Sequence, residues 1–216
     1  MKGIAIIGVS GFVGSAILHE ALTRDLQINA IVRNPLNVMV TSLNLTVSEG
    51  DVMNEDKLAQ LLSGKEIVIS AYNPGWKNPN IYDDTLKGYK SIINAVKKAG
   101  VKRLLIVGGA GSLYVEPDKT LIESGGIPAS ILPGVKGLAD VYYNYLKPEK
   151  DIDWVFFSPA ASLVPGNRTG KYQLGKDNMI FDDKGESTIS VEDYAKAMLD
   201  ELENPAHHQE RFTIGY

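Results

Sequence analysis

Short apolar runs alternate with amphipathic stretches along the 216 residues of the chain. The apolar runs are rich in β-branched residues, which is typical of buried strands, and the stretches between them repeat apolar residues at helical spacing. Strands are predicted at Gly3–Ile7, Ile28–Val32, Leu43–Val47, Glu66–Ser70, Arg103–Val107, Asp153–Phe157 and Arg211–Ile214. Helices are predicted at Phe12–Arg24, Glu55–Leu62, Tyr82–Ala99, approximately Gly137–Leu146 and Val191–Leu202. This alternation predicts an α/β fold built on a doubly wound parallel sheet.

Residues that commonly begin or end helices stand at several predicted boundaries. Asn54 precedes a helix with two acids in its first turn, and Gly100 follows the helix that ends at Ala99. The segment from Ser190 to Asp193 resembles a capping box at the start of the last helix. We expect one domain over residues 1–216, in which residues from about 158 to 216 form a small extension on the substrate side.

A glycine-rich loop joins the first predicted strand to the first predicted helix. Gly8, Gly11 and Gly14 are spaced three apart in it. Gly8 allows a sharp turn, Gly11 allows a pyrophosphate to approach the backbone, and Gly14 allows close packing of the helix. The alternative is an ordinary tight turn between a strand and a helix. The residues predicted to hold the pyrophosphate are Gly8, Ser10, Gly11, Phe12, Val13 and Gly14.

The ends of the next two strands carry residues suited to the adenosine half of a dinucleotide. Arg33 stands where an acid would bind the ribose 2′-hydroxyl of NAD. Its planar, positively charged guanidinium group suits the 2′-phosphate of NADP. Asp51 is predicted to accept a hydrogen bond from the adenine amine, with Val52 covering the ring. The alternatives are a solvated arginine and an aspartate in a turn. NADP(H) is therefore the preferred cofactor, with NAD(H) as a possibility.

The remaining strand ends are predicted to surround the nicotinamide, because ligands bind at the carboxyl ends of parallel strands. Tyr72 and Trp76 follow the fourth strand, either as lid residues over a planar substrate or as surface aromatics. Ser112 is a candidate hydrogen-bond donor to a substrate carbonyl, or a turn serine. The residues predicted to form the walls of the nicotinamide end of the cofactor site are Ala71, Tyr72, Gly108, Gly109 and Pro159.

Taken together, these motifs resemble those of the atypical and extended short-chain dehydrogenase/reductases. The resemblance covers residues 1 to about 160, and it is carried by the glycine loop, Arg33, the Gly50–Val52 segment and the segments at 107–112 and 157–160. Within that group the chain is similar to compact NAD(P)H-binding proteins named NADH-flavin reductases, which are relatives of biliverdin reductase B and of NmrA-like regulators. The resemblance implies a Rossmann-type fold and hydride transfer from a nicotinamide cofactor.

The family places its acid tyrosine four residues before a lysine, and this chain departs from that pattern. Tyr143 and Lys147 match literally, but Lys147 lies too close to Pro159 for the helix and connection of the relatives. Lys136 has the better spacing, and Leu132 stands where its tyrosine would be. The sequence therefore predicts no tyrosine acid, which favours a flavin or similar planar acceptor, because reducing a ketone needs a positioned acid. Ser112 and Lys136 remain the candidate catalytic residues.

Composition narrows the remaining possibilities. The net charge is −4 without a basic cluster, which disfavours nucleic acid, and the chain has no cysteine and only three scattered histidines, which predicts no metal site. The absence of a targeting segment and of a membrane-spanning run predicts a cytoplasmic protein with a small-molecule substrate, in an unknown oligomeric state. The alternatives are a sugar-nucleotide epimerase or dehydratase and a non-enzymatic NADP-binding sensor. An epimerase needs a sizeable C-terminal subdomain to hold its nucleotide, and few residues remain after Phe157 to form one.

Overall fold

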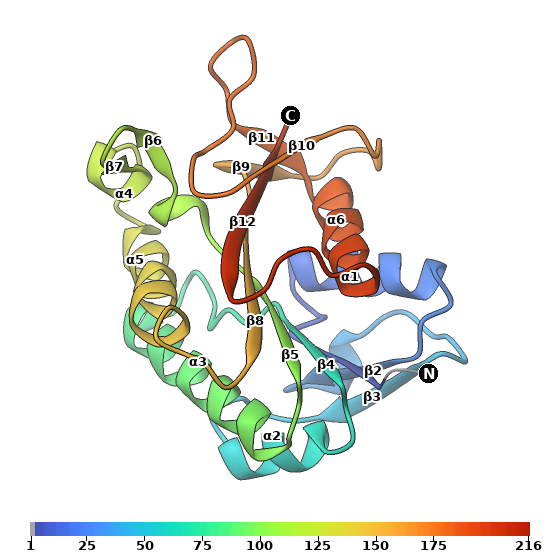
Figure 1. Ribbon diagram of the computed structural model, residues 1–216. Helices are drawn as coiled ribbons and strands as arrows, with labels where there is room; N and C mark the ends of the chain where they lie inside the picture. The colour runs from blue at the N-terminus through green and yellow to red at the C-terminus, as the bar shows by residue number, and fades with distance from the viewer. Residues whose placement is uncertain (1–2) are drawn as a thin grey trace.

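A mixed eight-stranded sheet with helices on both faces forms the body of the computed structural model, which describes residues 3–216 (Figure 1). Its strands are β1 (Ile4–Ile7), β2 (Ile28–Val32), β3 (Leu45–Glu49), β4 (Ile67–Ser70), β5 (Arg103–Val107), β8 (Asp153–Ser158), β10 (Gln173–Gly175) and β12 (Glu210–Gly215). The order across the sheet is β10-β12-β8-β5-β4-β1-β2-β3. All pairs are parallel except β10 with β12. This arrangement confirms the predicted α/β Rossmann-type fold.

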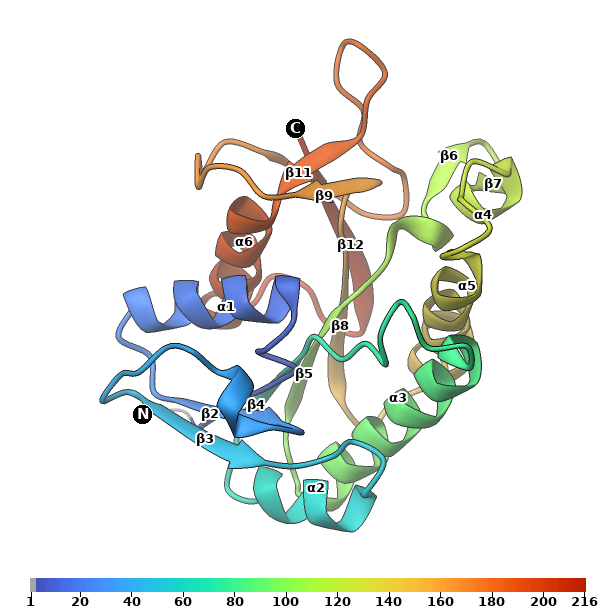
Figure 2. The same cartoon turned by 180° about the vertical axis from the view of Figure 1, so that it is seen from behind.

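Helices cover both faces of the sheet, α1 and α6 on one side and α2, α3 and α5 on the other (Figure 2). Their bounds are α1 (Phe12–Thr23), α2 (Glu55–Leu62), α3 (Ile81–Lys98), α5 (Leu132–Val141) and α6 (Val191–Glu203), and a π-helical turn, η3 (Tyr142–Leu146), continues α5. Successive residues of β1 serve opposite layers: Ile4 and Ile6 pack with α1 and α6, whereas Ala5 and Ile7 pack with α2 and α3. A strand buried on both faces reads as a continuous apolar run, which is why the pattern predicted it.

Short elements outside the main sheet were not predicted. They are β6 (Tyr114–Glu116), β7 (Lys119–Thr120), α4 (Leu121–Ser124), β9 (Ser162–Val164), β11 (Thr188–Ser190) and the 3-10 turns η1 (Pro35–Asn37) and η2 (Ala110–Ser112). Two predicted starts were also wrong by more than one residue. The third strand begins at Leu45, because Leu43 lies in an exposed loop, and α5 begins at Leu132, well before the predicted Gly137. No helix within residues 3–216 combines the length and apolar character needed to cross a membrane.

The predicted helix signals are confirmed at two ends and half confirmed at a third. The Asn54 side chain accepts a hydrogen bond from the Lys57 N–H at 3.1 Å, and Gly100 adopts a φ of 71° after α3. Ser190 likewise accepts from the Asp193 N–H at 3.1 Å. The capping box is not completed, because the Asp193 carboxylate is engaged elsewhere and the Ser190 N–H donates to the Tyr216 hydroxyl.

Candidate functional site

The sheet has a crevice at its carboxyl edge, where β1 lies between β2 and β4 and the strand order reverses. The loop after β1 leads directly into α1 at this point. In open α/β sheets such a switch point binds the ligand, because the loops on either side turn away in opposite directions.

The three glycines of the loop meet three different physical requirements. Gly8 has a φ of +86°, and a Cβ there would lie 2.7 Å from the carbonyl oxygen of Ala71. A Cβ on Gly14 would lie 2.1 Å from the Gly8 oxygen, so a side chain is excluded by the protein itself. Beside Gly11 the nearest atom, again the Gly8 oxygen, is 3.5 Å away. The space beside Gly11 is therefore open, at the start of a helix, where a pyrophosphate fits.

A cavity of about 200 Å³ opens on the β2 side of the glycine loop. It brings together Arg33, Val52, Ser10 and the backbone of Gly8 and Gly11, as an adenosine site requires. It is lined by Ile7, Gly8, Ser10, Gly11, Ile31, Val32, Arg33, Gly50, Val52, Ala71, Tyr72 and Asn73.

Asp51 does not line this cavity, although its neighbours Gly50 and Val52 do. Its carboxylate accepts the Met53 N–H at 2.9 Å, and its carbonyl oxygen accepts the Asn54 N–H at 3.0 Å. The side chain therefore stabilises the turn into α2, in agreement with the alternative interpretation, and its contact with adenine remains a prediction.

A larger cleft of about 530 Å³ opens on the other side of the glycine loop. Of the residues assigned from the sequence, Gly11, Phe12, Val13, Gly14, Ala71, Tyr72, Gly108, Gly109 and Pro159 line it. Apolar residues that the sequence analysis missed also line it, among them Ile131, Val135 and Leu138 from α5 and its approach, and Leu163 from β9. The helical spacing of the α5 residues was a usable signal, but the predicted helix began after two of them.

None of the residues that line this cleft is an acid, a lysine, an arginine or a histidine. Three of its hydroxyls donate to backbone carbonyls: Tyr72 to Asp84 at 3.1 Å, Tyr89 to Tyr72 at 3.1 Å, and Thr85 to Ile81 at 2.6 Å. Burial and the nearby Asp84 raise the pKa of Tyr72 to about 12. These groups are poorly placed to give a proton to a substrate.

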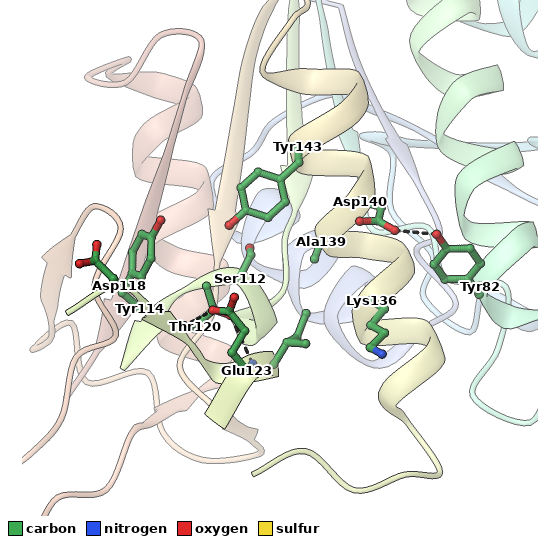
Figure 3. Close-up of a pocket in the computed structure, with 11 residues that line it drawn as sticks. Tyr82, Ser112, Tyr114, Asp118, Thr120, Glu123, Lys136, Ala139, Asp140 and Tyr143 are labelled. Atoms are coloured by element: carbon green, nitrogen blue, oxygen red, sulfur yellow. Dashed lines mark hydrogen bonds between the residues drawn. The ribbon is translucent and has the colours of Figure 1, made fainter. Parts of the chain in front are cut away.

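Ser112, Lys136 and Tyr143 lie in a different cavity, of about 610 Å³, on the other side of α5 (Figure 3). The Ser112 hydroxyl is buried and accepts a hydrogen bond from Nη1 of Arg211 at 2.9 Å, while Lys136 is exposed. The structure therefore does not bring these three residues together with the glycine loop. The sequence could not show this, because Arg211 is 99 residues away from Ser112. A catalytic role for Ser112 or Lys136 stays a prediction.

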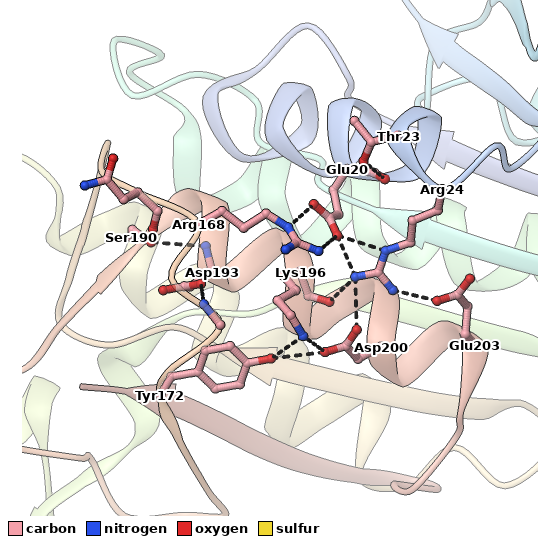
Figure 4. A network of polar contacts seen from close by, with 12 residues as sticks. Glu20, Thr23, Arg24, Arg168, Tyr172, Ser190, Asp193, Lys196, Asp200 and Glu203 are labelled. Atoms are coloured by element: carbon pink, nitrogen blue, oxygen red, sulfur yellow. Dashed lines mark hydrogen bonds and ion pairs between the residues drawn. The ribbon is translucent and has the colours of Figure 1, made fainter.

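The C-terminal extension is attached to the glycine-loop helix by a polar network (Figure 4). The buried carboxylate of Glu20 accepts from Nε of Arg24 at 2.8 Å and from Nε of Arg168 at 2.8 Å. Hydrogen bonds from Arg168 and Arg24 lower the pKa of Glu20 despite its burial. The loop that carries Arg168 follows β9, whose Leu163 lines the cleft, so this network joins that part of the extension to α1.

The model of a family described as NAD(P)H-binding matches residues 8–205, which include the glycine loop and most of the extension. The chain belongs to this NAD(P)H-binding family. The match agrees with the geometry, since it begins at the first glycine of the loop.

Three similar proteins represent the relatives of this NAD(P)H-binding protein. The uncharacterized protein YwnB of Bacillus subtilis is 40% identical over 216 residues, which cover 98% of this chain and 97% of YwnB. The structure of a putative epimerase from Bacteroides thetaiotaomicron is 56% identical, with a TM-score of 0.95 over 100% of this chain and 97% of that chain. A putative NADH-flavin reductase from Streptococcus pneumoniae is 31% identical, with a TM-score of 0.86 over 100% of this chain and 99% of that chain.

Proposed function

We propose that the protein transfers hydride from NADP(H) to a flavin or a similar planar conjugated acceptor. The observation that carries this proposal is the cleft beside the glycine loop, which is lined mainly by apolar and backbone groups and by no aspartate, glutamate, lysine, arginine or histidine. Bound there, the reduced cofactor supplies a hydride, which is a proton with two electrons. The residues of the chain bind and orient the two rings and exclude water around them.

The lack of a positioned acid separates the possible reactions. Reducing a ketone to an alcohol requires a proton on oxygen as the hydride arrives, and an epimerase requires a base and an acid on the sugar. A flavin accepts the hydride into an electron-poor ring, and the reduced ring takes its further proton from water. The apolar side chains of Ile131 and Val135, which line the cleft from α5 and its approach, suit a planar conjugated ring.

The preference for NADP(H) rests on Arg33. It lines the adenosine-side cavity together with Ser10 and the backbone of Gly11, and no acid lines that cavity. A guanidinium forms paired hydrogen bonds with a phosphate, whereas the ribose hydroxyls of NAD(H) are usually bound by a carboxylate. NAD(H) remains a possible second cofactor.

The names of the relatives divide between the candidate functions. The Streptococcus pneumoniae protein carries the name of an NADH-flavin reductase, which agrees with the proposal, and the Bacteroides thetaiotaomicron protein carries that of an epimerase. A protein that binds NADP and signals to a partner without turnover is the third candidate. We assign residues from about 158 to 216 to the substrate side, because Leu163 and its neighbours wall the cleft.

Anaerobic oxidation of NADPH tests the proposal, with flavins, quinones and sugar nucleotides offered one at a time. We expect turnover of a flavin or quinone and none of a UDP- or GDP-sugar. The Tyr143→Phe variant is measured in the same assay. Because Tyr143 lies across α5 from the cleft, we expect the turnover number of this variant to match that of the wild type. A hundredfold loss, about the contribution of a general acid, would restore the tyrosine-dependent mechanism. Tight NADPH binding with no turnover of any acceptor would favour the sensor.

A further inference from the structure

We propose that Phe12 and Trp76 clamp the ring of the acceptor inside the cleft, that this ring is uncharged, and that Gly134 positions Trp76. This inference rests on the proposed function and specifies how its acceptor is recognised. The two aromatic side chains line the same cleft from different elements, Phe12 from the first turn of α1 and Trp76 from the loop between β4 and α3.

The loop that carries Trp76 is shaped locally. Gly75 has a φ of +110°, which favours glycine, and its N–H donates to the Asn73 side chain at 2.7 Å. This turn directs the following indole toward α5. A Cβ on Gly134 of α5 would lie 3.0 Å from Cζ3 of Trp76 and 2.7 Å from Cδ1 of Ile81. Gly134 therefore forms a notch into which one edge of the indole fits.

The notch leaves most of the indole uncovered. Trp76 is 54% exposed and Phe12 is 50% exposed, although both sit beside a largely apolar cleft. A large aromatic surface held in place on one side and open to a cleft on the other is suited to stacking on a flat ligand. Because Phe12 also belongs to the glycine loop, the clamp begins where the cofactor site ends.

The lining of the cleft determines the charge of the ring. A charged group moved from water into an apolar site without a partner is strongly disfavoured, and no side chain that is charged at neutral pH lines this cleft. The acceptor ring is therefore neutral, and any phosphate of its side chain stays in solvent. Riboflavin, which has an uncharged ring and no phosphate, is the appropriate probe.

Calorimetry provides a readout that is independent of turnover. Riboflavin is titrated into the protein saturated with NADP⁺, which cannot donate hydride. We expect Trp76→Leu and Phe12→Leu each to weaken riboflavin binding about tenfold, and Trp76→Phe to retain most of the affinity. Trp76→Leu should leave the affinity for NADP⁺ unchanged. Leu174→Ala is the matched control, because Leu174 is similarly exposed but lies on the edge strand β10.

The positioning role of Gly134 has its own measurement. In Gly134→Ala the added methyl group occupies the notch, so Trp76 should become more accessible to acrylamide quenching of its fluorescence, while riboflavin binding weakens. Trp154, the other tryptophan, is 2% exposed and contributes little to that change. If Gly134→Ala does not fold, the comparison of Trp76→Leu with Trp76→Phe carries the test alone.

The outcomes distinguish this inference from the proposed function. If riboflavin binds all the variants as it binds the wild type, the clamp is wrong while flavin reduction still stands. If FMN binds far more tightly than riboflavin, the protein recognises the phosphate, and the inference that this group stays in solvent is overturned. If the wild type oxidises NADPH with no flavin or quinone, the proposed function itself fails.

Discussion

At the scale of single residues, the charge at the end of β2 determines which cofactor is favoured. Arg33 follows the last residue of the strand and is exposed at the adenosine-side cavity. Its guanidinium has no ion-pair partner among residues 3–216 and is available to a phosphate. The backbone around it belongs to the parallel sheet and does not depend on the side chain.

Arg33→Glu should therefore change cofactor choice without changing stability. Loss of a charge-assisted contact costs about 1.5–3 kcal/mol, so NADPH binding should weaken strongly and NADH binding little. Isothermal titration of both cofactors measures the difference. Lys184→Glu makes the same change of net charge at the exposed turn near Gly185 and is the control. Equal losses for NADPH and NADH would contradict the assignment of Arg33.

Substitutions at two glycines of the loop should affect different properties, cofactor binding in one case and stability in the other. Gly11→Val places a side chain in the open space meant for the pyrophosphate, so the variant should fold and fail to bind cofactor. Gly14→Ala should instead lower the free energy of unfolding by about 1–3 kcal/mol or more, since its methyl group overlaps the Gly8 oxygen. Urea denaturation and cofactor titration on both variants check this contrast. A folded Gly11→Val that binds NADPH normally would show that the pyrophosphate lies elsewhere.

At the scale of elements, the start of α6 holds the loop between β9 and β10. The buried carboxylate of Asp193 accepts from the Thr169 hydroxyl at 2.6 Å, the Gly170 N–H at 2.7 Å and the Tyr216 hydroxyl at 2.8 Å. Burial alone would raise the pKa of Asp193, but these hydrogen bonds outweigh it and hold that pKa below its usual value. One side chain thus joins a helix, a loop and the C-terminal residue.

Asp193 should make the stability of the fold depend on acid pH. Because its pKa is lower in the folded state, its contribution is present above the unfolded value of about 3.9 and is lost as the pH falls through the folded value. Asp193→Asn should cost about 1–3 kcal/mol at neutral pH and flatten the decline of stability in acid. Thermal unfolding across that pH range measures both effects. Asp183→Asn, in an exposed turn, is the control, and an identical slope in Asp193→Asn would contradict the assignment.

At the scale of the whole molecule, the two edges of the sheet have different roles. The carboxyl edge carries the crevice, and the opposite edge carries a buried ion-pair cluster. There Arg103, the first residue of β5, pairs with Glu201 of α6 at 2.6 Å and also with Asp153 at the start of β8. Glu201 further accepts the His207 N–H at 3.0 Å. The cluster joins the last helix and the chain before β12 to the centre of the sheet.

Glu201→Ala should therefore destabilise the fold and leave the site unchanged. Removing one member of a buried ion pair costs up to about 3–5 kcal/mol, and here Arg103 loses its buried partner and keeps only the partly exposed Asp153. Chemical denaturation should show this loss, while the affinity for NADPH stays that of the wild type under conditions where the variant is folded. Lys176→Ala, which breaks an exposed pair with Glu210, should change stability by less than about 1 kcal/mol. A cofactor affinity that falls with Glu201→Ala would mean that the two edges are coupled.

The sequence by itself determined the features that depend on neighbours along the chain. The periodicity of apolar residues located β2, β5 and α2 to the residue, because burial on two faces or on one face imposes its own repeat on the chain. The steric demands of Gly8 and Gly14 could likewise be read from their spacing and context, and the matching family confirms the kind of ligand.

Only the tertiary structure decided what the side chains face. Ser112 and Tyr143 have suitable chemistry in the sequence, yet Arg211 binds the serine, and the tyrosine, in the η3 turn after α5, lines a cavity away from the glycine loop. Ile131 and Val135 have no chemistry to attract notice, and they line the cleft. The physical reason is that a local pattern fixes which residues are buried, whereas the partner of a buried polar group and the occupant of a cleft are set by segments that meet only after the sheet has formed.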